Sequence, residues 1–205
     1  MGKRPKKAYE FKLAILIPTL YERLEVFNET YGELLYQLRK NNLFDKVLIK
    51  YYPDDGKLST GRKRNLLIKR VAAKCEYLAF FDDDDRPADD YIKTLYDTLM
   101  ANPGVDVVNF IVEYTMDGKY PKPLRFSKRY KSYIQEPSGR YKRPPGHLSA
   151  MKTKIAHDFK FPDITQGEDV EWAMKISDSG RIKTEVNIDR VLYYYLYDST
   201  KNIMV

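Results

Sequence analysis

The chain has 205 residues, of which 43% are hydrophobic and 32% charged, and this balance excludes an intrinsically disordered protein and predicts one globular domain. No apolar run approaches the roughly 20 residues that cross a bilayer, and no secretory signal follows the start, so we expect a cytoplasmic protein. The formal net charge of +7 indicates an anionic partner.

The first half of the chain alternates predicted strands and helices. Apolar runs predict strands at 13–17, 47–51, 77–81 and 105–112. Helical spacing of apolar residues predicts helices over 20–38, from Ser59-Thr60 onward, and around Ile92, Leu95 and Leu99. This order predicts an α/β fold with a mostly parallel central sheet and helices on both faces. We place the only cysteine, Cys75, on the inner face of the second helix, and without a second cysteine it forms no internal disulfide.

The second half has a different character. Residues 117–147 are rich in Pro, Gly, Tyr and basic residues, and nine residues between Lys119 and Arg143 are Lys or Arg. We interpret this segment as a long loop with at most one short strand pair, which either carries function or is only a solvated basic face. A helix at 167–176 and late strands at 181–186 and 191–197 follow, and we expect a small antiparallel portion near the C-terminus.

Four consecutive aspartates, Asp82 to Asp85, follow the apolar run 77–81. Ligands of open α/β sheets bind at the carboxyl ends of the strands. Carboxylates gathered there repel each other unless a cation neutralises them or some take up protons, and oxygen ligands of this kind suit Mg²⁺ or Mn²⁺. A metal site is therefore favoured over a solvated turn, whereas Asp89 and Asp90 are interpreted as caps of the next helix.

Several motifs then occur in a characteristic order: Ile17-Pro18-Thr19, Asp54-Asp55-Gly56, Gly61 to Asn65, the acidic strand end and Gly167-Glu168-Asp169. Together they resemble nucleotide-sugar-dependent glycosyltransferases of the GT-A (Rossmann-like) fold, most closely family 2, over about residues 12–198. The short length is similar to that of minimal members encoded by viruses and phages, for which the host cytoplasm would be the location. The resemblance implies a basic tail at 1–11, a nucleotide-binding half at 12–115 and an acceptor-side half at 116–205.

The resemblance also implies which residues hold the donor, a nucleotide sugar, with UDP-sugars favoured. The residues assigned to the donor nucleotide are Pro18, Thr19, Tyr21, Arg23, Asp54, Asp55, Arg62, Arg64, Asn65, Asp82 and Asp83. Asp84, together with Asp82, is assigned to a Mn²⁺ or Mg²⁺ ion that stabilises the leaving diphosphate. Because four aspartates are present, the register of the triplet is ambiguous by one, and Asp83 and Asp85 remain alternatives.

For the transfer itself, the resemblance implies that Asp169 is the general base, with Glu168 beside it, and that a single displacement on a glycan or glycoconjugate hydroxyl inverts the anomeric configuration. On sequence alone, the favoured interpretation is that both acids are only first-turn residues stabilised by a helix dipole, and the other motifs shift the preference to catalysis for Asp169. The expected sugar pocket contains His147, Gly146 and Trp172. Many relatives carry a metal-binding histidine in the last strand, and here Tyr197, Asp198 or His147 would replace it.

Two other functions compete with this interpretation. The basic and aromatic stretch 119–143 could bind nucleic acid without catalysis, although the acidic cluster would repel a polyanion. A metal-dependent phosphotransferase with an aspartate nucleophile would need an Asp-x-Asp-x-Thr pattern after the first strand, where this chain has Pro18-Thr19.

Overall fold

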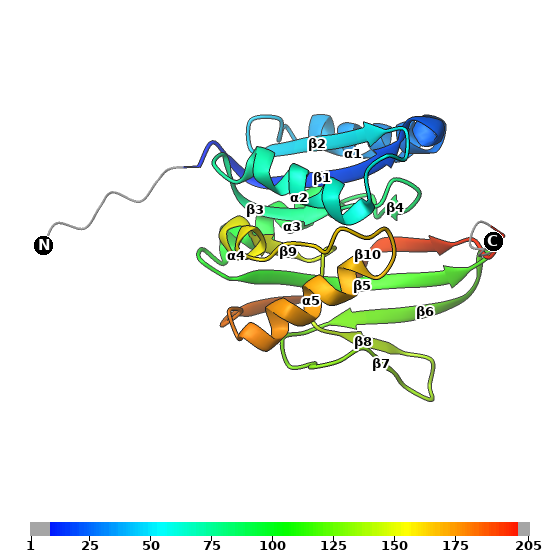
Figure 1. The fold of residues 1–205 in the computed structure, drawn as a ribbon. Coiled ribbons are helices and arrows are strands. Elements are labelled where there is room, and N and C mark those ends of the chain that lie inside the picture. Colours follow the sequence, from blue (N-terminus) through cyan, green and yellow to red (C-terminus); the bar gives the residue numbers. More distant parts are fainter. Residues whose placement is uncertain (1–8, 201–205) are drawn as a thin grey trace, which may run out of the picture.

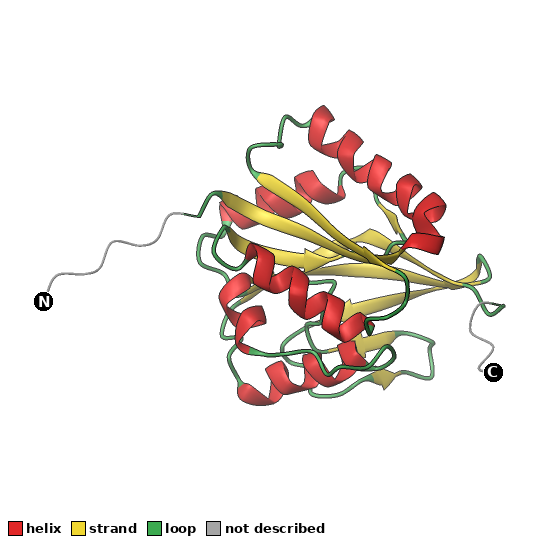
Figure 2. Ribbon diagram, turned by 45° about the horizontal axis from the view of Figure 1, so that its top comes forward, coloured by secondary structure: helices red, strands yellow, loops and turns green. Residues whose placement is uncertain are grey.

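The computed structural model describes residues 9–200, so most of the predicted basic tail lies outside the described residues. The described part forms one twisted mixed sheet with helices on both faces (Figures 1 and 2). Its strands are β1 (Phe11–Leu20), β2 (Val47–Asp54), β3 (Cys75–Phe80), β4 (Arg86–Pro87), β5 (Val107–Met116), β6 (Lys119–Phe126), β7 (Ile134–Gln135), β8 (Tyr141–Arg143), β9 (Ala150–Lys152) and β10 (Glu185–Tyr197).

Helices cover the sheet in two layers, as the alternation of elements in the sequence predicts. α1 and α3 pack on one face, and α2, α4 and α5 lie on the other (Figure 1). The helices are η1 (Tyr21–Arg23), α1 (Leu24–Lys40), α2 (Thr60–Val71), α3 (Tyr91–Ala101), α4 (Thr153–Asp158) and α5 (Glu168–Ser179). No helix of residues 9–200 is long and apolar enough to cross a membrane.

The strand order brings the chemically important strand ends together. β1 lies between β2 and β3, and both pairs are parallel, so the carboxyl ends of all three strands meet at one edge of the sheet. β5 and β10 are also parallel, whereas β6 and β9 pair antiparallel with β5. The result is the expected α/β architecture, with its antiparallel part in the second half of the chain.

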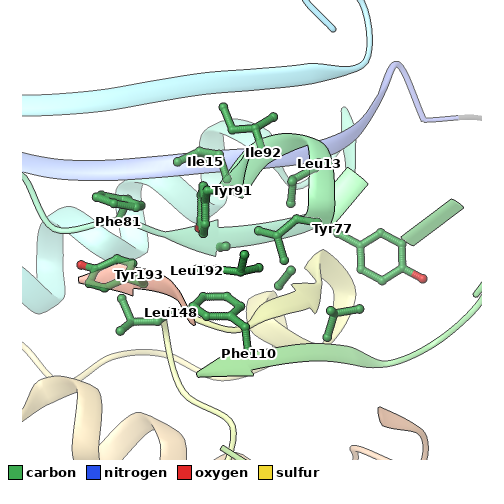
Figure 3. Close-up of a cluster of buried hydrophobic side chains, with 14 of the residues drawn as sticks. Leu13, Ile15, Tyr77, Phe81, Tyr91, Ile92, Phe110, Leu148, Leu192 and Tyr193 are labelled. Atoms are coloured by element: carbon green, nitrogen blue, oxygen red, sulfur yellow. The ribbon is translucent and has the colours of Figure 1, made fainter. Parts of the chain in front are cut away.

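Each face of the sheet has its own apolar core. One cluster joins β1 and β3 to α1, α3 and the end of β10, where the rings of Phe81 and Tyr193 lie 4.4 Å apart (Figure 3). The other cluster packs α2, α4 and α5 on the opposite face and contains Trp172, which stacks on Phe161. A sheet buried on both faces explains why β1 is a continuous apolar run.

Three sequence-based expectations about the elements are wrong. Cys75 is the first residue of β3 rather than part of the preceding helix, which ends at Val71; it is buried, and burial raises the pKa of its thiol to about 11. The segment 117–147 contains more than one short strand pair, because β6 forms a hairpin with β5 and also pairs with β8, which in turn pairs with β7. The two late strands are one strand, β10, whose pairing with β5 shifts register between Ile188 and Tyr193.

Candidate active site

A cavity of about 360 Å³ opens at the carboxyl ends of β1 and β3, where the aspartate run follows the sheet. β10 and the start of α5 close its other side. We call it the donor-side cavity. Its lining residues are Pro18, Thr19, Leu20, Arg23, Thr60, Lys63, Arg64, Asp82, Asp83, Asp84, Thr165, Glu168, Tyr195, Leu196, Tyr197 and Asp198.

Asp82 is the first aspartate of the run and lies between two cationic or ionisable side chains. Its Oδ1 accepts a hydrogen bond from Nη2 of Arg64 at 2.9 Å, and its Oδ2 lies 3.4 Å from Nε2 of His147. Burial of Asp82 acts to raise its pKa, but the Arg64 guanidinium, His147 and Arg23 together hold the pKa well below its ordinary value. Asp82 is therefore ionised at neutral pH.

Arg23, in η1, bridges the next two aspartates. Its Nη2 lies 2.7 Å from Oδ1 of Asp83 and 2.6 Å from Oδ2 of Asp84. Asp83 is buried and also accepts a hydrogen bond from Thr19 at 2.6 Å; burial nevertheless raises its pKa to about 6. Asp84 is about one third exposed and is the aspartate of the run most open to solvent.

Asp85 is committed to the sheet. Its Oδ2 accepts a hydrogen bond from the Tyr193 hydroxyl at 2.5 Å, and its Oδ1 accepts the backbone N–H of Leu196 at 2.8 Å. Only 1% of Asp85 is exposed, and burial raises its pKa well above the ordinary value. Asp85 fixes the acidic turn against β10, and this favours Asp82 to Asp84 as the functional triplet.

A second cavity of about 420 Å³ adjoins the first, and we call it the acceptor-side cavity. Arg64, Asp82, Glu168 and two tyrosines of β10 line both cavities. Its lining residues are Arg64, Asp82, Asp85, Val112, Leu124, Arg143, His147, Leu148, Thr165, Gln166, Gly167, Glu168, Asp169, Tyr195 and Tyr197. The two hollows thus form one continuous site.

Glu168 and Asp169 begin α5 between the two cavities. Gly167 precedes them with φ of +81°, a left-handed conformation that favours glycine and turns the chain into the helix. Glu168 is buried 3.6 Å from Nη1 of Arg64, and burial raises its pKa. Asp169 is partly exposed, and its Oδ2 lies 3.5 Å from Nδ1 of His147. His147 therefore connects the acidic turn to the first turn of α5.

Arg64 is the cation at the centre of the site. Its side chain is 5% exposed and lies against the rings of Phe80 and Phe161 at 5.3 and 5.5 Å. Its Nε and Nη1 are buried without a hydrogen-bond partner among the described residues. Buried N–H groups of this kind usually find a partner, and the nearest carboxylate to Nη1 is that of Glu168, at 3.6 Å.

The structure brings many, but not all, of the sequence-assigned residues into the two cavities. Pro18, Thr19, Arg23, Arg64, Asp82, Asp83, Asp84, His147, Glu168 and Asp169 line one or both. The remaining seven, which line neither, are Tyr21, Asp54, Asp55, Arg62, Asn65, Gly146 and Trp172.

Two of these seven have structural roles that explain their positions. Trp172 was expected in the sugar pocket but is fully buried, and its Nε1 donates to the carbonyl of Phe159. Asn65 was expected at the diphosphate, but its side chain donates to the carbonyl of Phe161 and accepts the N–H of the same residue. Asn65 ties the segment before α5 to α2, and Trp172 ties the same segment to α5.

Four more of the seven residues face solvent, form surface ion pairs or pack against neighbouring side chains instead of lining a cavity. Tyr21 is 58% exposed, and Arg62 is also exposed, 3.9 Å from Asp163. Asp55 pairs with Lys57 at the surface. Gly146 is buried, and a Cβ there would contact Phe126 and Ala173 at 3.8 and 3.9 Å. These contacts place the four residues beside the site rather than inside it.

Asp54 and Lys63 form a buried pair that the sequence analysis did not predict. Lys63 Nζ lies 2.8 Å from Oδ1 of Asp54 and donates to the carbonyl of Thr19 at 3.0 Å. Burial acts to raise the pKa of Asp54, but Lys63 and the N–H of Leu58 bring it below its ordinary value. The pair joins the ends of β1 and β2 under the donor-side cavity.

The residues fit a divalent ion that is shared with a ligand. The described residues contain no group of three His, Cys, Asp or Glu that could hold a metal without further ligands. Asp84 and Asp82 nevertheless present carboxylates to the same cavity. Mg²⁺ commonly takes one or two protein carboxylates and completes its shell with water and substrate phosphates.

Similarity to solved structures concerns the fold. Residues 1–349 of TarS from S. aureus match with a TM-score of 0.60 and 16% identity, over 91% of this chain and 60% of that one. The catalytic domain of Drosophila beta1,4galactosyltransferase 7, in complex with xylobiose, matches with a TM-score of 0.57 and 14% identity, over 94% and 74%. The mannosyltransferase PcManGT from Pyrobaculum calidifontis, in complex with GDP-Man and Mn²⁺, matches with a TM-score of 0.54 and 14% identity, over 93% and 58%.

The chain spans less than two thirds of the TarS fragment and of the mannosyltransferase. None of the curated proteins compared with the chain by sequence matches it significantly. The sequence model of Glycosyl transferase family 2 matches residues 29–159, which is more than half of the chain and includes β2, α2 and the whole acidic turn. The chain therefore belongs to glycosyl transferase family 2.

Proposed function

We propose that the protein transfers a sugar from a nucleoside diphosphate sugar, with UDP-sugars favoured, to a hydroxyl group of a glycan or glycoconjugate, with inversion at the anomeric carbon. The observation that carries the proposal is the junction of the two cavities at Asp82, Arg64 and Glu168. A donor in the first cavity and an acceptor in the second would meet at that junction.

The donor-side cavity suits a diphosphate. Arg64 and Lys63 both lie in the wall of this cavity, and their positive charges favour phosphate oxygens. Arg23, which is partly exposed at the edge of this cavity, can also turn toward a phosphate. Thr19 and Pro18 border the space left for the nucleoside.

A divalent ion, Mn²⁺ or Mg²⁺, would be held by Asp84, with Asp82 as a second carboxylate. When bound, such an ion stabilises the negative charge that develops on the departing diphosphate. The structural relative from Pyrobaculum calidifontis holds Mn²⁺ together with GDP-Man, which supports a shared site for metal and diphosphate. Asp198, in the wall opposite the aspartates, is the candidate for a further ligand.

Asp169 is the proposed general base. It is partly exposed in the acceptor-side cavity, where it can accept the proton of an attacking hydroxyl. His147 lies between Asp169 and Asp82 and would orient both carboxylates. Buried Glu168 beside Arg64 would hold that guanidinium at the junction.

The experiment that tests this function is a panel of UDP-, GDP- and dTDP-sugars incubated with Mn²⁺ or Mg²⁺, with release of the nucleoside diphosphate measured for each. We expect release from at least one donor, and a rise in melting temperature that needs both Mn²⁺ and the matching nucleoside diphosphate. Asp84→Asn should abolish both effects. Asp89→Asn, an exposed acid outside both cavities, is the matched control.

The outcome against the proposal is binding of oligonucleotides that depends on salt and is unchanged by Asp84→Asn, with no donor turnover. That result would favour the nucleic-acid-binding alternative.

A further inference from the structure

A group of half-buried tyrosines lies on the sheet beside the acceptor-side cavity. We call it the tyrosine platform: Tyr114 of β5, Tyr141 of β8, and Tyr195 and Tyr197 of β10. The ring of Tyr114 lies 5.7 Å from Tyr141, 5.5 Å from Tyr195 and 6.1 Å from Tyr197. Tyr195 and Tyr197 also line the acceptor-side cavity, so the platform leads directly into it.

Two cations border this platform. Arg143 lines the acceptor-side cavity, and its guanidinium lies 4.8 Å from the ring of Tyr133 and 5.9 Å from that of Tyr141. Lys122 lies 6.0 Å from the Tyr141 ring on the other side. Within residues 9–200, neither cation has a carboxylate within 4.0 Å, and neither side chain donates a hydrogen bond to the protein.

The same strands provide an internal comparison. Side chains alternate between the two faces of a strand. Arg125 lies between Leu124 and Phe126 in β6, and Lys142 lies between Tyr141 and Arg143 in β8. The side chains of Arg125 and Lys142 therefore point away from the platform. Both of these cations are paired: Arg125 lies 2.6 Å from Asp189, and Lys142 pairs with Glu136. Arg125 and Lys142 are thus neutralised by the protein, whereas Arg143 and Lys122 have no carboxylate partner within residues 9–200.

The cavity beyond the platform has the opposite charge. Asp169, Glu168 and Asp82 gather at its inner end, so a continuous polyanion would be repelled there. A ligand that fits the whole surface has an uncharged hydroxyl at Asp169 and a negative group farther out, between Arg143 and Lys122. The faces of the tyrosine rings suit the apolar C–H face of a sugar, and their hydroxyls remain available to water or to sugar hydroxyls.

We propose that the acceptor is an anionic glycan whose sugar lies on the tyrosine platform and whose phosphate or carboxylate group is bound by Arg143 and Lys122. This inference rests on the proposed transfer reaction and names the class of its acceptor. A guanidinium near two aromatic rings, as Arg143 is near Tyr133 and Tyr141, is well suited to a bidentate contact with a phosphate or a carboxylate.

The test is direct binding of defined oligosaccharides to the intact protein, measured by calorimetry. The probes are maltohexaose, which is neutral, hexagalacturonate, which carries carboxylates, and a phosphorylated mannose oligosaccharide; dT12 serves as a polyanion without the glycan. We expect at least one of the anionic glycans to bind tenfold or more tightly than maltohexaose and more tightly than dT12, with binding that weakens as salt increases.

Single-residue variants test which cation binds the anionic group of the glycan. Arg143→Met keeps the length of the side chain and removes the charge, and should weaken binding of the anionic glycan about tenfold or more. Arg143→Lys should restore part of the loss, and Lys122→Met should weaken binding less. Arg125→Met, on the same sheet but facing away, is the matched control and should bind like the wild type. Donor hydrolysis without acceptor should persist in Arg125→Met, which lies outside both cavities.

Equal affinity for neutral and anionic glycans, or tighter binding of dT12, would overturn the proposal. So would an unchanged affinity in Arg143→Met, or a loss in Arg143→Met that Arg143→Lys does not relieve. Failure of the proposed function looks different, because the wild type would then hydrolyse no nucleotide sugar, whatever glycan it binds.

Discussion

The Tyr193 hydroxyl donates a hydrogen bond to the buried carboxylate of Asp85 at 2.5 Å and joins the end of the sheet to the acidic turn. The same hydroxyl accepts the backbone N–H of Asp82 at 3.2 Å, so one side chain of β10 holds both ends of the aspartate run. The turn that carries four acids is thereby held in one conformation by a residue more than 100 positions away in the chain.

Tyr193→Phe removes this hydroxyl and leaves a buried carboxylate oxygen and a backbone N–H without a partner. We expect the free energy of unfolding to fall by about 1–3 kcal/mol, measured by urea denaturation. Tyr194→Phe is the control, because Tyr194 is half-buried and its hydroxyl makes no hydrogen bond within residues 9–200. Equal losses in the two variants would contradict the role assigned to Tyr193.

Stability should depend on the protonation of Asp83. Burial raises the pKa of Asp83 from 3.8 to about 6 against the opposing effects of Thr19 and Arg23. As the pH rises, the carboxyl of Asp83 loses its proton at a higher pH in the folded state than in the unfolded state. Below about pH 4 both states are protonated, and the carboxyl does not reduce the free energy of unfolding. Between about pH 4 and pH 6 it reduces that free energy progressively. The loss is about 3 kcal/mol for a shift of this size.

Asp83→Asn should therefore flatten the fall in unfolding free energy between about pH 4 and pH 6, measured by urea denaturation across that range. Asp89→Asn, which changes an exposed carboxyl, should keep the wild-type slope. If the unfolding free energy of Asp83→Asn falls with pH as steeply as that of the wild type, the desolvation of Asp83 is not the cause of the fall.

The parts of the fold that periodicity encodes could be predicted from the sequence. The alternating strands and helices of the first half, and the helix cap at Ser59, whose side chain accepts the N–H of Arg62, agree with the expectation. The end of α2 could not be predicted, because residues 72–74 contain no glycine or proline and continue the helical pattern up to Cys75.

Contacts across the sheet decided the parts of the site that the sequence did not predict. Arg64 and Lys63 resemble ordinary surface cations of a basic helix, and only their carboxylate partners Asp82 and Asp54 make their burial possible. Trp172 could have been assigned correctly, because it shares the apolar face of α5 with Ala173 and Ile176 at helical spacing. The family resemblance assigned Trp172 to the sugar pocket, and this helical pattern opposes that assignment.

Gly61 shows how closely α2 approaches the segment before α5. A Cβ at Gly61 would lie 1.9 Å from the carbonyl oxygen of Pro162, and the Gly61 N–H donates to the carbonyl of Ile164. Gly61→Ala must displace this backbone, and we expect a loss of about 1–3 kcal/mol in unfolding free energy together with weaker binding of the nucleoside diphosphate. Gly32→Ala, in α1 with open space around it, should be neutral or stabilising by up to about 1 kcal/mol.

If thermal denaturation and nucleotide titration show no difference between the two alanine variants, the contact with Pro162 does not constrain the site. A loss of stability in Gly61→Ala with unchanged nucleotide affinity would mean that the segment 159–166 supports the fold without shaping the donor-side cavity.

Asp169→Asn tests the proposed base, since the amide keeps the shape of the side chain and cannot accept the proton. We expect the rate of transfer to the acceptor to fall by about 100-fold or more, while the affinity for the donor, measured by calorimetry with the nucleoside diphosphate and Mn²⁺, stays close to that of the wild type. The geometry gives the reason: Asp169 lines the acceptor-side cavity and no part of the donor-side cavity, whereas its neighbour Glu168 lines both and pairs with Arg64. Glu168→Gln should therefore weaken donor binding as well as transfer, and it serves as the comparison variant one residue away.

Because His147 lies 3.5 Å from Asp169, His147→Ala should lower transfer less than Asp169→Asn does, by releasing the carboxylate rather than removing it. Equal losses of donor affinity in Asp169→Asn and Glu168→Gln would assign Asp169 to the binding of the donor and would remove it from the proton transfer.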